Sequence, residues 1–403
     1  MESIKLVSHT VKGNRVEYKF SCPSAFDKYL KTQTFYMEYP EKYDLNQVPD
    51  ALLMVPFVGN ILTMNMFFGY QVDVPELDKT FYDSLRNIAK VYKEMFPYLH
   101  LKFDVKAKSK DCTGLIENKS LFFTGGLDAT SALTEVAKQG ITLINIWGGD
   151  VSTKDYNAHK KLDEYMNELS TSLSLKYAFV KSNCREMYDE KAISRFTALR
   201  IKPWENHGWW ASFAHILAMT SLIAPLTYLE HIGIHYVASS YNANCKTFDA
   251  NNELLINAIK FSSCKLQMVD NTLGRIEKAQ KIILFRNRTN IPLKLKVCWF
   301  HKNGENCSQC EKCYRTILEI IVNHGNPNMF GFTFEKDNYL HLKRYLDNNF
   351  VNVAFWKPIQ EKFNQERSYW EQFPEIEWFL NYKFNGIYAY MHKISSVLKK
   401  FIP

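Results

Sequence analysis

Residues 121–133, LFFTGGLDATSAL, decide the fold of this chain. A short apolar run ends at TGG (residues 124–126), and the chain then passes through LDATS (residues 127–131) into an apolar segment that can form a helix. This order predicts a strand, a glycine turn and a helix. Paired glycines let backbone amides approach a ligand closely, and hydroxyls at a helix N-terminus add donors where the helix dipole favours an anion. The stretch therefore predicts a phosphate-binding turn, although a Gly-Gly pair before a helix also serves as a plain tight connection.

The segments after this turn alternate between helical and strand-like patterns. Helices are expected at residues 129–139 and 156–173, and strands at residues 141–147, 177–181 and 234–239. Such alternation predicts an α/β fold with a parallel sheet and helices on both faces. Ligands of these sheets bind beyond the carboxyl ends of the strands, where Gly125-Gly126 and Gly148-Gly149 both fall.

The first 105 residues carry a mixed pattern. Alternating residues predict a hairpin across residues 11–21, and residues 77–96 have the apolar spacing of a helix. Residues 51–70 are apolar but interrupted by proline and glycine, which favours buried strands over one spanning helix. The polar segment at residues 106–120 marks a boundary between two parts of the chain.

The composition is typical of a globular protein. The chain has 403 residues, of which 46% are hydrophobic and 15% aromatic, enough for a buried core in two or three parts. The net charge of +8 favours an anionic partner, such as a nucleotide, nucleic acid or acidic protein, or serves solubility. Because the N-terminal residues are charged and lack a secretion signal, we expect a cytoplasmic protein. Residues 209–229 are long enough to cross a bilayer, but their Ser and Thr content predicts a buried helix and no membrane span.

Four of the nine cysteines form a C-x8-C-x2-C-x2-C cluster: Cys298, Cys307, Cys310 and Cys313. In a reducing compartment this spacing indicates metal binding and not disulfides. Each x2 spacing lets two thiolates face one ion, and the longer loop returns a fourth ligand to close a tetrahedron. Four sulfur ligands leave no open position, so the pattern predicts structural zinc, with an iron–sulfur cluster as the alternative. His301, inside the loop, is a substitute ligand or a solvated side chain.

The glycine turn resembles the SGGxDS loop of the PP-loop ATP pyrophosphatase superfamily, whose members split ATP between its α and β phosphates to form an adenylate. Thr124 stands where that family has serine and keeps the hydroxyl, whereas Ala129 replaces the second serine. The hydroxyls of Thr130 and Ser131 would have to take its place. The residues that the resemblance assigns to ATP are Thr124, Gly125, Gly126, Leu127, Asp128, Thr130 and Ser131.

The order of the motifs is similar to that of the 7-cyano-7-deazaguanine synthase (QueC) family, in which a PP-loop precedes a four-cysteine pattern. Lys278, in GRIEKAQKI, stands where that family has a lysine near the phosphates, although Lys278 and Arg275 also fit exposed charges on a helix. The similarity covers about residues 121–325. Trp209-Trp210 replaces an Arg-Asn pair of the family, and both ends are extended. The chain is therefore more similar to the divergent QueC-like proteins of bacterial anti-phage operons, some of which are thought to attach a deazapurine to a protein.

These motifs divide the chain into an N-terminal α+β extension (residues 1–115), a PP-loop ATPase domain with the four-cysteine zinc site (residues 116–330) and a C-terminal helical extension (residues 331–403). A helix is expected directly after the cysteines, at residues 311–323, where zinc would clamp it to the sheet domain. Trp147 and Gly148 complete the predicted ATP site. Trp147, like Trp209 and Trp210, either stacks on the purine or packs in the core.

The resemblance implies an ATP-dependent ligase or synthase with ATP, Mg²⁺ and structural zinc. Mg²⁺ would bind near Asp128, which is alternatively a helix N-cap, and Lys278 would contact the phosphates. A carboxylate, 7-carboxy-7-deazaguanine or a relative, would attack the α-phosphate. Ammonia, a small-molecule amine or a protein amino group would then displace AMP and give an amide, nitrile or conjugate. The second-rank candidates are Asp150 and Asp270, which are alternatively helix caps. An acid/base role is conceivable for His207, but positions in the core or at its rim are expected for all four histidines of this region: His207, His215, His231 and His235.

Two other functions stay open. In the first alternative, the protein has lost ATP turnover, in line with Ala129, and is an ATP-binding scaffold for a partner. Alternatively, the chain adenylates a base of tRNA, as other PP-loop families do, which predicts a clustered basic surface. Lys and Arg are scattered without a dense run, which counts against tRNA. The oligomeric state is left open, a homodimer included.

Overall fold

The computed structural model of the chain describes residues 2–205, 207–240, 249–298, 304–387 and 389–391. The chain forms two compact units. The larger unit comprises Met1–Thr124 and Ser131–Leu273, and the smaller unit comprises Gly125–Thr130 and Gly274–Pro403. The glycine turn therefore belongs to the same unit as the four cysteines.

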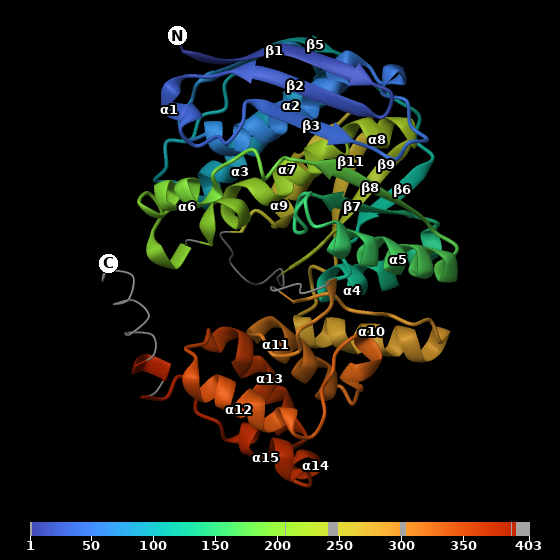
Figure 1. Cartoon of the computed structure of the whole chain (residues 1–403), viewed down its shortest axis with the longest axis vertical. Helices are drawn as coiled ribbons and strands as arrows, with labels where there is room; N and C mark the ends of the chain where they lie inside the picture. Colours follow the sequence, from blue (N-terminus) through green and yellow to red (C-terminus); the bar gives the residue numbers. More distant parts are fainter. Residues whose placement is uncertain (1, 206, 241–248, 299–303, 388, 392–403) are drawn as a thin grey trace. The chain divides into compact units, whose positions relative to one another are not determined.

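The larger unit is built on one sheet of 11 strands (Figure 1). The strands are β1 (Ser3–Lys12), β2 (Arg15–Ser21), β3 (Thr34–Glu38), β4 (Gln71–Asp78), β5 (Val105–Lys110), β6 (Asn118–Phe122), β7 (Thr142–Trp147), β8 (Lys176–Ser182), β9 (Ile232–Ala238), β10 (Lys260–Phe261) and β11 (Cys264–Val269). Their order is β10-β11-β9-β6-β7-β8-β3-β2-β1-β4-β5. Strands β11, β9, β6, β7 and β8 run parallel, which confirms the predicted α/β fold with a mostly parallel sheet.

The N-terminal strands continue this sheet through β3 and β8, which pair antiparallel. Met37 of β3 is opposite Ser182 of β8, and Ser182 Oγ donates a hydrogen bond to the Tyr36 carbonyl at 2.8 Å. Strands β1 and β2 form the predicted hairpin, with Lys12 opposite Arg15. The N-terminal segment, which the sequence analysis treats as an extension, thus supplies five of the 11 strands of one continuous sheet.

The helices of the larger unit connect and cover the strands. They are α1 (Ser24–Asp27), α2 (Asp50–Asn65), α3 (Lys79–Met95), α5 (Tyr156–Leu173), α6 (Glu190–Ala198), α7 (His215–Leu222), α8 (Ala224–Leu229) and α9 (Glu253–Ala258), while α4 (Leu127–Val136) begins in the glycine turn of the smaller unit. Helix α2 packs against β4 and α7, α5 against β8, and α8 against β9. The predicted helices at residues 77–96, 129–139 and 156–173 are confirmed by α3, α4 and α5.

The prediction of buried strands at residues 51–70 is wrong, because Asp50–Asn65 form helix α2. Nearly every side of this helix is buried, so the sequence lacks the apolar stripe of a surface helix. Pro56 lies inside the helix, and its carbonyl accepts a hydrogen bond from Asn60 Nδ2 at 2.9 Å. Gly59 permits close contact with α7, since a Cβ there would lie 2.5 Å from Ser221 Cβ. Pro56 and Gly59, which suggested that no helix forms here, therefore belong to a tightly packed core helix.

The apolar stretch after Trp209 is also helical and buried. It forms a π-helical turn, Trp210–Ala214, followed by α7 and α8. Among the described residues, Trp210–Leu229 is the one helical run long and apolar enough to cross a membrane, by length and composition only, and 83% of its most apolar window is buried inside the protein. This burial fits the predicted core helix.

The smaller unit is helical after the glycine turn. Its helices are α10 (Arg275–Thr289), α11 (Glu311–Ile321), α12 (Asn338–Asn348), α13 (Val353–Gln365), α14 (Arg367–Trp370) and α15 (Pro374–Leu380). Helix α11 packs against α10 and α13, and α15 packs against α12, α13 and α14. The sequence predicted the helix after the cysteines and the helical C-terminal part.

A fully buried histidine lies between the central strands. His235 of β9 shares a hydrogen bond through Nδ1 with Ser120 Oγ of β6 at 2.7 Å, and its ring meets that of Phe122 edge to face at 4.1 Å. Burial lowers the pKa of His235 to about 3. The ring is therefore neutral at physiological pH and belongs to the core, as the sequence predicted.

This histidine makes the fold sensitive to mild acid. An unfolded chain binds a proton at histidine near pH 6.5, about 3.5 units above the folded pKa of His235, so protonation favours unfolding as the pH falls below about 6.5. Between pH 7.5 and pH 5.0 we expect His235 to remove about 2 kcal/mol of stability. Urea unfolding at both pH values measures this loss, which should disappear in His235→Gln and persist in His100→Gln at an exposed position. An equal pH effect in His235→Gln and the wild type would contradict this account.

Candidate nucleotide and metal sites

The glycine turn and the start of α4 have the predicted geometry. Gly125 has φ of 75°, in the left-handed region that favours glycine. Its carbonyl accepts a hydrogen bond from the Lys296 amide at 2.7 Å, and the Thr130 amide donates to the Gly126 carbonyl at 2.9 Å. Leu127 and Ala129 are buried. The predicted order of strand, glycine turn and helix is confirmed by β6, the turn and α4.

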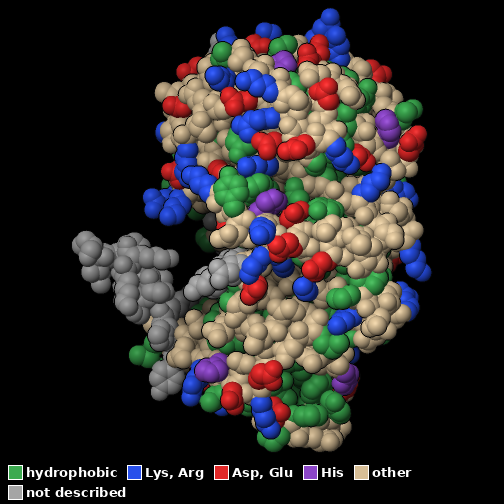
Figure 2. All heavy atoms as spheres, turned by 45° about the vertical axis from the view of Figure 1, so that its right-hand side comes forward, with side chains coloured by type: hydrophobic (Ala, Val, Ile, Leu, Met, Phe, Trp, Pro, Cys, Tyr) green, Lys and Arg blue, Asp and Glu red, His purple; other side chains and the backbone are tan. Residues whose placement is uncertain are grey.

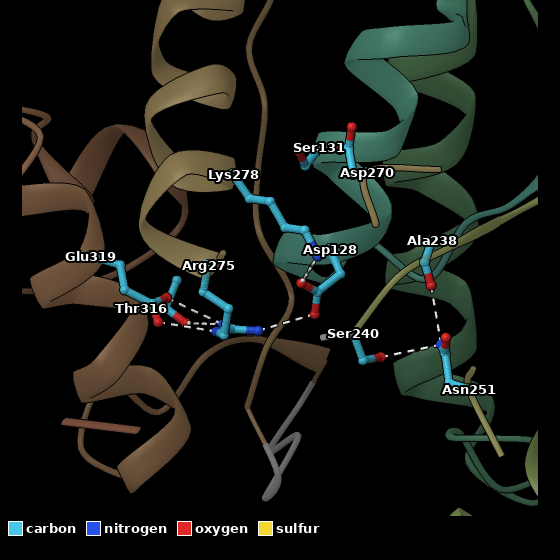
Figure 3. Close-up of polar contacts among 10 residues, drawn as sticks. All are labelled: Asp128, Ser131, Ala238, Ser240, Asn251, Asp270, Arg275, Lys278, Thr316 and Glu319. Atoms are coloured by element: carbon cyan, nitrogen blue, oxygen red, sulfur yellow. Dashed lines mark hydrogen bonds and ion pairs between the residues drawn. The ribbon is translucent and has the colours of Figure 1, made fainter. Parts of the chain in front are cut away.

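Asp128, in the first turn of α4, is shared by two cations from α10 (Figure 3). Its Oδ1 lies 3.2 Å from Lys278 Nζ, and its Oδ2 lies 3.0 Å from Arg275 Nη1. Lys278 is only 1% exposed, so the alternative of an exposed helix charge is wrong for this residue. Both oxygens of Asp128 thus face cations, and the structure brings together Asp128 and Lys278, two of the predicted site residues.

Helix α11 fixes the guanidinium group of Arg275 (Figure 3). Nε and Nη2 of Arg275 lie 3.0 and 3.2 Å from the two carboxylate oxygens of Glu319, and Nη2 lies 3.2 Å from Thr316 Oγ1. Burial raises the pKa of Glu319, and the neighbouring Arg275 opposes this rise only in part. Sequence reasoning missed Thr316 and Glu319. Their spacing of three residues, shortly after Cys313 on the same helix, was the available signal.

The charges of this cluster are placed where helix dipoles are positive. Arg275 and Lys278 occupy the first turn of α10, and Asp128 occupies the first turn of α4. A helix N-terminus carries about half a positive charge, which disfavours cations and attracts anions. The carboxylates of Asp128 and Glu319 contact the two basic side chains, and Glu277 also lies in the first turn of α10. The two helix dipoles and the two basic side chains favour anions at this place.

The hydroxyls expected to replace the missing serine differ in their surroundings. Thr130 Oγ1 is buried and has no hydrogen-bond partner among the described residues. A buried hydroxyl without a partner costs about 1 to 3 kcal/mol, which a ligand acceptor would recover. In the larger unit, Ser131 Oγ donates to Asp270 Oδ2 at 2.5 Å. Thr124 is half-buried, and Asp150 is exposed.

Trp147 and Gly148 have contacts that serve the fold of the larger unit. The Trp147 ring stacks on that of His159 at 3.7 Å, and its Nε1 donates to the Ser152 carbonyl at 2.9 Å. Gly148 has φ of 113°, and a Cβ there would lie 1.8 Å from the Ser182 carbonyl oxygen. Only glycine fits at this position. The packing interpretation thus accounts for both residues without a nucleotide.

The remaining candidates lie along the buried helical run. Trp209 is fully buried and its Nε1 donates to the Thr63 carbonyl at 3.0 Å, whereas Trp210 is half-buried with Arg185 Cζ 4.8 Å from its ring centre. His207 is exposed, and His215 and His231 are half-buried. The described contacts do not join these side chains to Asp128.

The four cysteines converge on one point of the smaller unit. Their Sγ atoms all lie within 4.8 Å of one another, with 3.9 Å between Cys298 and Cys310 and 3.9 Å between Cys307 and Cys313. Four sulfurs about 2.3 Å from a tetrahedral zinc ion are about 3.8 Å apart. The cluster can therefore hold a metal ion such as zinc. An iron–sulfur cluster would need a wider cage, because several irons and sulfides fill its centre. His301 lies outside the described residues.

Local hydrogen bonds shape this cage. Asn306 Oδ1 accepts from the amides of Val297 and Cys298 at 3.0 and 3.2 Å, and its Nδ2 donates to the Leu295 carbonyl at 2.7 Å. Cys310 immediately precedes α11, and Cys313 lies in its first turn. The hydrogen bond with Cys310, together with burial, raises the pKa of the Cys313 thiol. A bound cation would offset the charge of the thiolates.

Comparison with known proteins adds no family to this geometry. The chain matched no protein-family model, and no curated protein matched it significantly. The assignment of function therefore rests on the residues and their contacts.

We expect the purified protein to carry one zinc ion per chain, because the sulfur cage matches a tetrahedral ion. Replacing one ligand in Cys310→Ser should remove the ion and lower the melting temperature. Cys22→Ser, which changes a half-buried cysteine of the larger unit, should retain it. Inductively coupled plasma mass spectrometry gives the metal content. Equal zinc in both variants would contradict a four-sulfur site.

Proposed function

We propose that this protein is an ATP-dependent ligase of PP-loop type, similar to the 7-cyano-7-deazaguanine synthases, that adenylates a carboxylate and joins it to an amine in the cytoplasm. The observation that carries the proposal is the sharing of Asp128 by Lys278 and Arg275 at two helix N-termini. An ion pair with a purely structural role would not require two cations placed where the dipoles of two helices are unfavourable to them. A triphosphate at this place would gain from all of these charges.

The sheet of the larger unit has a strand order that is typical of sheets that bind a ligand. From β6 the chain proceeds to β7 and β8 on one side, whereas β9 and β11 lie on the other side of β6. Open α/β sheets bind ligands at the carboxyl ends of strands where the order reverses in this way. The glycine turn begins two residues after the end of β6.

In the proposed ATP complex, Mg²⁺ would replace the two cations as the partner of Asp128. Lys278 and Arg275 would then turn to the phosphate oxygens, and Thr130 Oγ1 and the amides of the turn would add donors. Mg²⁺ would offset the negative charge of the phosphates. Glu319 would keep Arg275 oriented. These residues act by positioning and by electrostatic stabilisation of phosphate charge.

The proposed reaction has two displacements. A carboxylate oxygen of the substrate attacks the α-phosphorus, the bond to the bridging oxygen breaks, and pyrophosphate leaves. The amine nitrogen then attacks the acyl carbon of the adenylate, AMP leaves and the nitrogen loses a proton. The resemblance favours 7-carboxy-7-deazaguanine or a relative as the carboxylate, and ammonia, a small amine or a protein amino group as the acceptor. With ammonia, the product is an amide or, after dehydration, a nitrile.

The two other functions make different demands on the surface and the site. An RNA substrate needs a concentrated basic field, whereas on the face shown in Figure 2 Lys and Arg are interspersed with Asp and Glu. A scaffold without turnover would fit Ala129, but it does not explain why Lys278 is buried beside Asp128. We therefore treat both as outcomes of the test below.

The test is the carboxylate-dependent exchange of labelled pyrophosphate into ATP, with 7-carboxy-7-deazaguanine as substrate. We expect exchange by the wild type and at least about a 100-fold loss in Asp128→Asn, which keeps the shape but removes the charge for Mg²⁺. Arg275→Gln should lose a similar amount. The matched control is Arg288→Gln, at an exposed position of the same helix, which should exchange at the wild-type rate.

Each other outcome has a clear meaning. Tight ATP binding without exchange favours the scaffold, and exchange that appears only with added tRNA favours the RNA-modifying enzyme. Full exchange in Asp128→Asn contradicts the assigned role of this carboxylate.

A further inference from the structure

A basic groove lies in the larger unit, apart from the residues discussed above. It has a volume of about 700 Å³ and runs between α3 and the segment that leads into β5. The residues that define it here are Arg86, Lys90, Lys93, Lys102, Asp104 and Val105. We call this surface the basic groove.

The cations of the basic groove form a row on one side of α3. Arg86, Lys90 and Lys93 follow at intervals of four and three residues, which places them on the same face of the helix. Lys102 lies on the opposite wall, and Asp104 is the single acidic residue of the lining. Lys90 pairs with Glu94 at 3.8 Å.

Most of this positive charge is uncompensated. Within the described part of the chain, Arg86, Lys93 and Lys102 form no ion pair. Surface cations are usually dispersed among carboxylates, as on the face in Figure 2. A groove whose charged lining residues are four cations and one carboxylate therefore fits an anionic ligand.

The basic groove opens onto the edge of the sheet. Val105 lines the groove and is also the first residue of β5, which is the last strand and pairs only with β4. The outer side of an edge strand presents backbone N–H and C=O groups without a sheet partner. At Val105 the carbonyl accepts a hydrogen bond from Tyr82 Oη at 3.2 Å, so the edge available for pairing lies beyond Val105. Lys106, Lys108 and Lys110 of β5 are exposed. The first and last of these pair with Asp73 and Glu76 of β4 at 3.3 Å each.

We propose that the basic groove and the free edge of β5 together bind an acidic polypeptide segment in extended conformation. The segment would add a strand beside β5 through backbone hydrogen bonds and direct its carboxylates to Arg86, Lys93, Lys102 and Lys108. Side chains on one face of a strand recur about every 6.8 Å, close to the spacing of successive cations on a helix face.

Of the three lysines of β5, Lys108 forms no ion pair within the described part of the chain, and its charge selects the sign of the partner. Like charges would meet if the same edge of a second copy paired with β5, so Lys108 disfavours self-association. An acidic strand meets the opposite sign and escapes this repulsion. A nucleic acid would use the charge but not the backbone groups of the edge, which is why the two features together favour a polypeptide.

The experiment measures binding of labelled probes to the full chain by fluorescence anisotropy. The first probe is a fluorescein-labelled ten-residue peptide of alternating Glu and Val. The second has Pro in place of Val, which keeps the charge but removes the backbone donors that a strand needs. The third is a single-stranded thymidine dodecamer. We expect the Glu-Val peptide to bind at least about tenfold more tightly than the other two.

Charge-reversal variants locate the surface. Arg86→Glu/Lys93→Glu should weaken binding of the Glu-Val peptide at least about tenfold, whereas the matched control Lys138→Glu/Lys191→Glu, at exposed positions of the same unit, should not. Lys108→Glu, on the edge strand, should weaken binding as well. Equal binding of the Glu-Val and Glu-Pro peptides would overturn strand addition. Tighter binding of the dodecamer, or no binding of any probe, would overturn the proposal.

Discussion

Asp128 brings the first turn of α4 into contact with the first turn of α10 through ion pairs to Lys278 and Arg275. Asp128 is distant in sequence from Arg275 and Lys278, which are neighbours on α10, and Lys278 is 1% exposed. Leaving one partner of a buried ion pair uncompensated costs about 3 to 5 kcal/mol, and less where solvent reaches the pair, as at Asp128. This contact therefore sets where the glycine turn lies in the smaller unit, and the proposed chemistry depends on the same groups.

The cysteine cluster and the ion cluster meet on one helix. Cys310 and Cys313 are at the start of α11, and Thr316 and Glu319, on the following turns, orient Arg275. A metal ion that fixes the start of α11 thereby fixes the guanidinium group two turns later. The metal site would serve the proposed nucleotide site from a distance, by positioning, and would take no part in the reaction.

The sequence predicted those features that depend on local patterns. Short-range sequence signatures predicted three of these features: the strand, turn and helix around Gly125, the parallel strands that follow, and the convergence of the four cysteines. Helix α2 has no such signature, because a helix that is buried on all sides shows no apolar periodicity. Its Gly59 is explained only by the close contact with Ser221. The continuity of the sheet through β3 and β8 depends on pairing between residues far apart in the chain. Likewise, the role of Glu319 becomes visible only when α10 and α11 lie together.

The central claim is that the cations around Asp128 bind a triphosphate. Calorimetric titration of Mg²⁺–ATP into the purified protein tests it most directly, with Lys278→Met as the variant that keeps the apolar stem of the side chain. The control is Lys281→Met on the same helix, and circular dichroism shows whether each variant is folded. The account predicts binding by the wild type and by the control, with at least about tenfold weaker affinity, or about 1.4 kcal/mol, in Lys278→Met. Equal affinity in a folded Lys278→Met variant would contradict it.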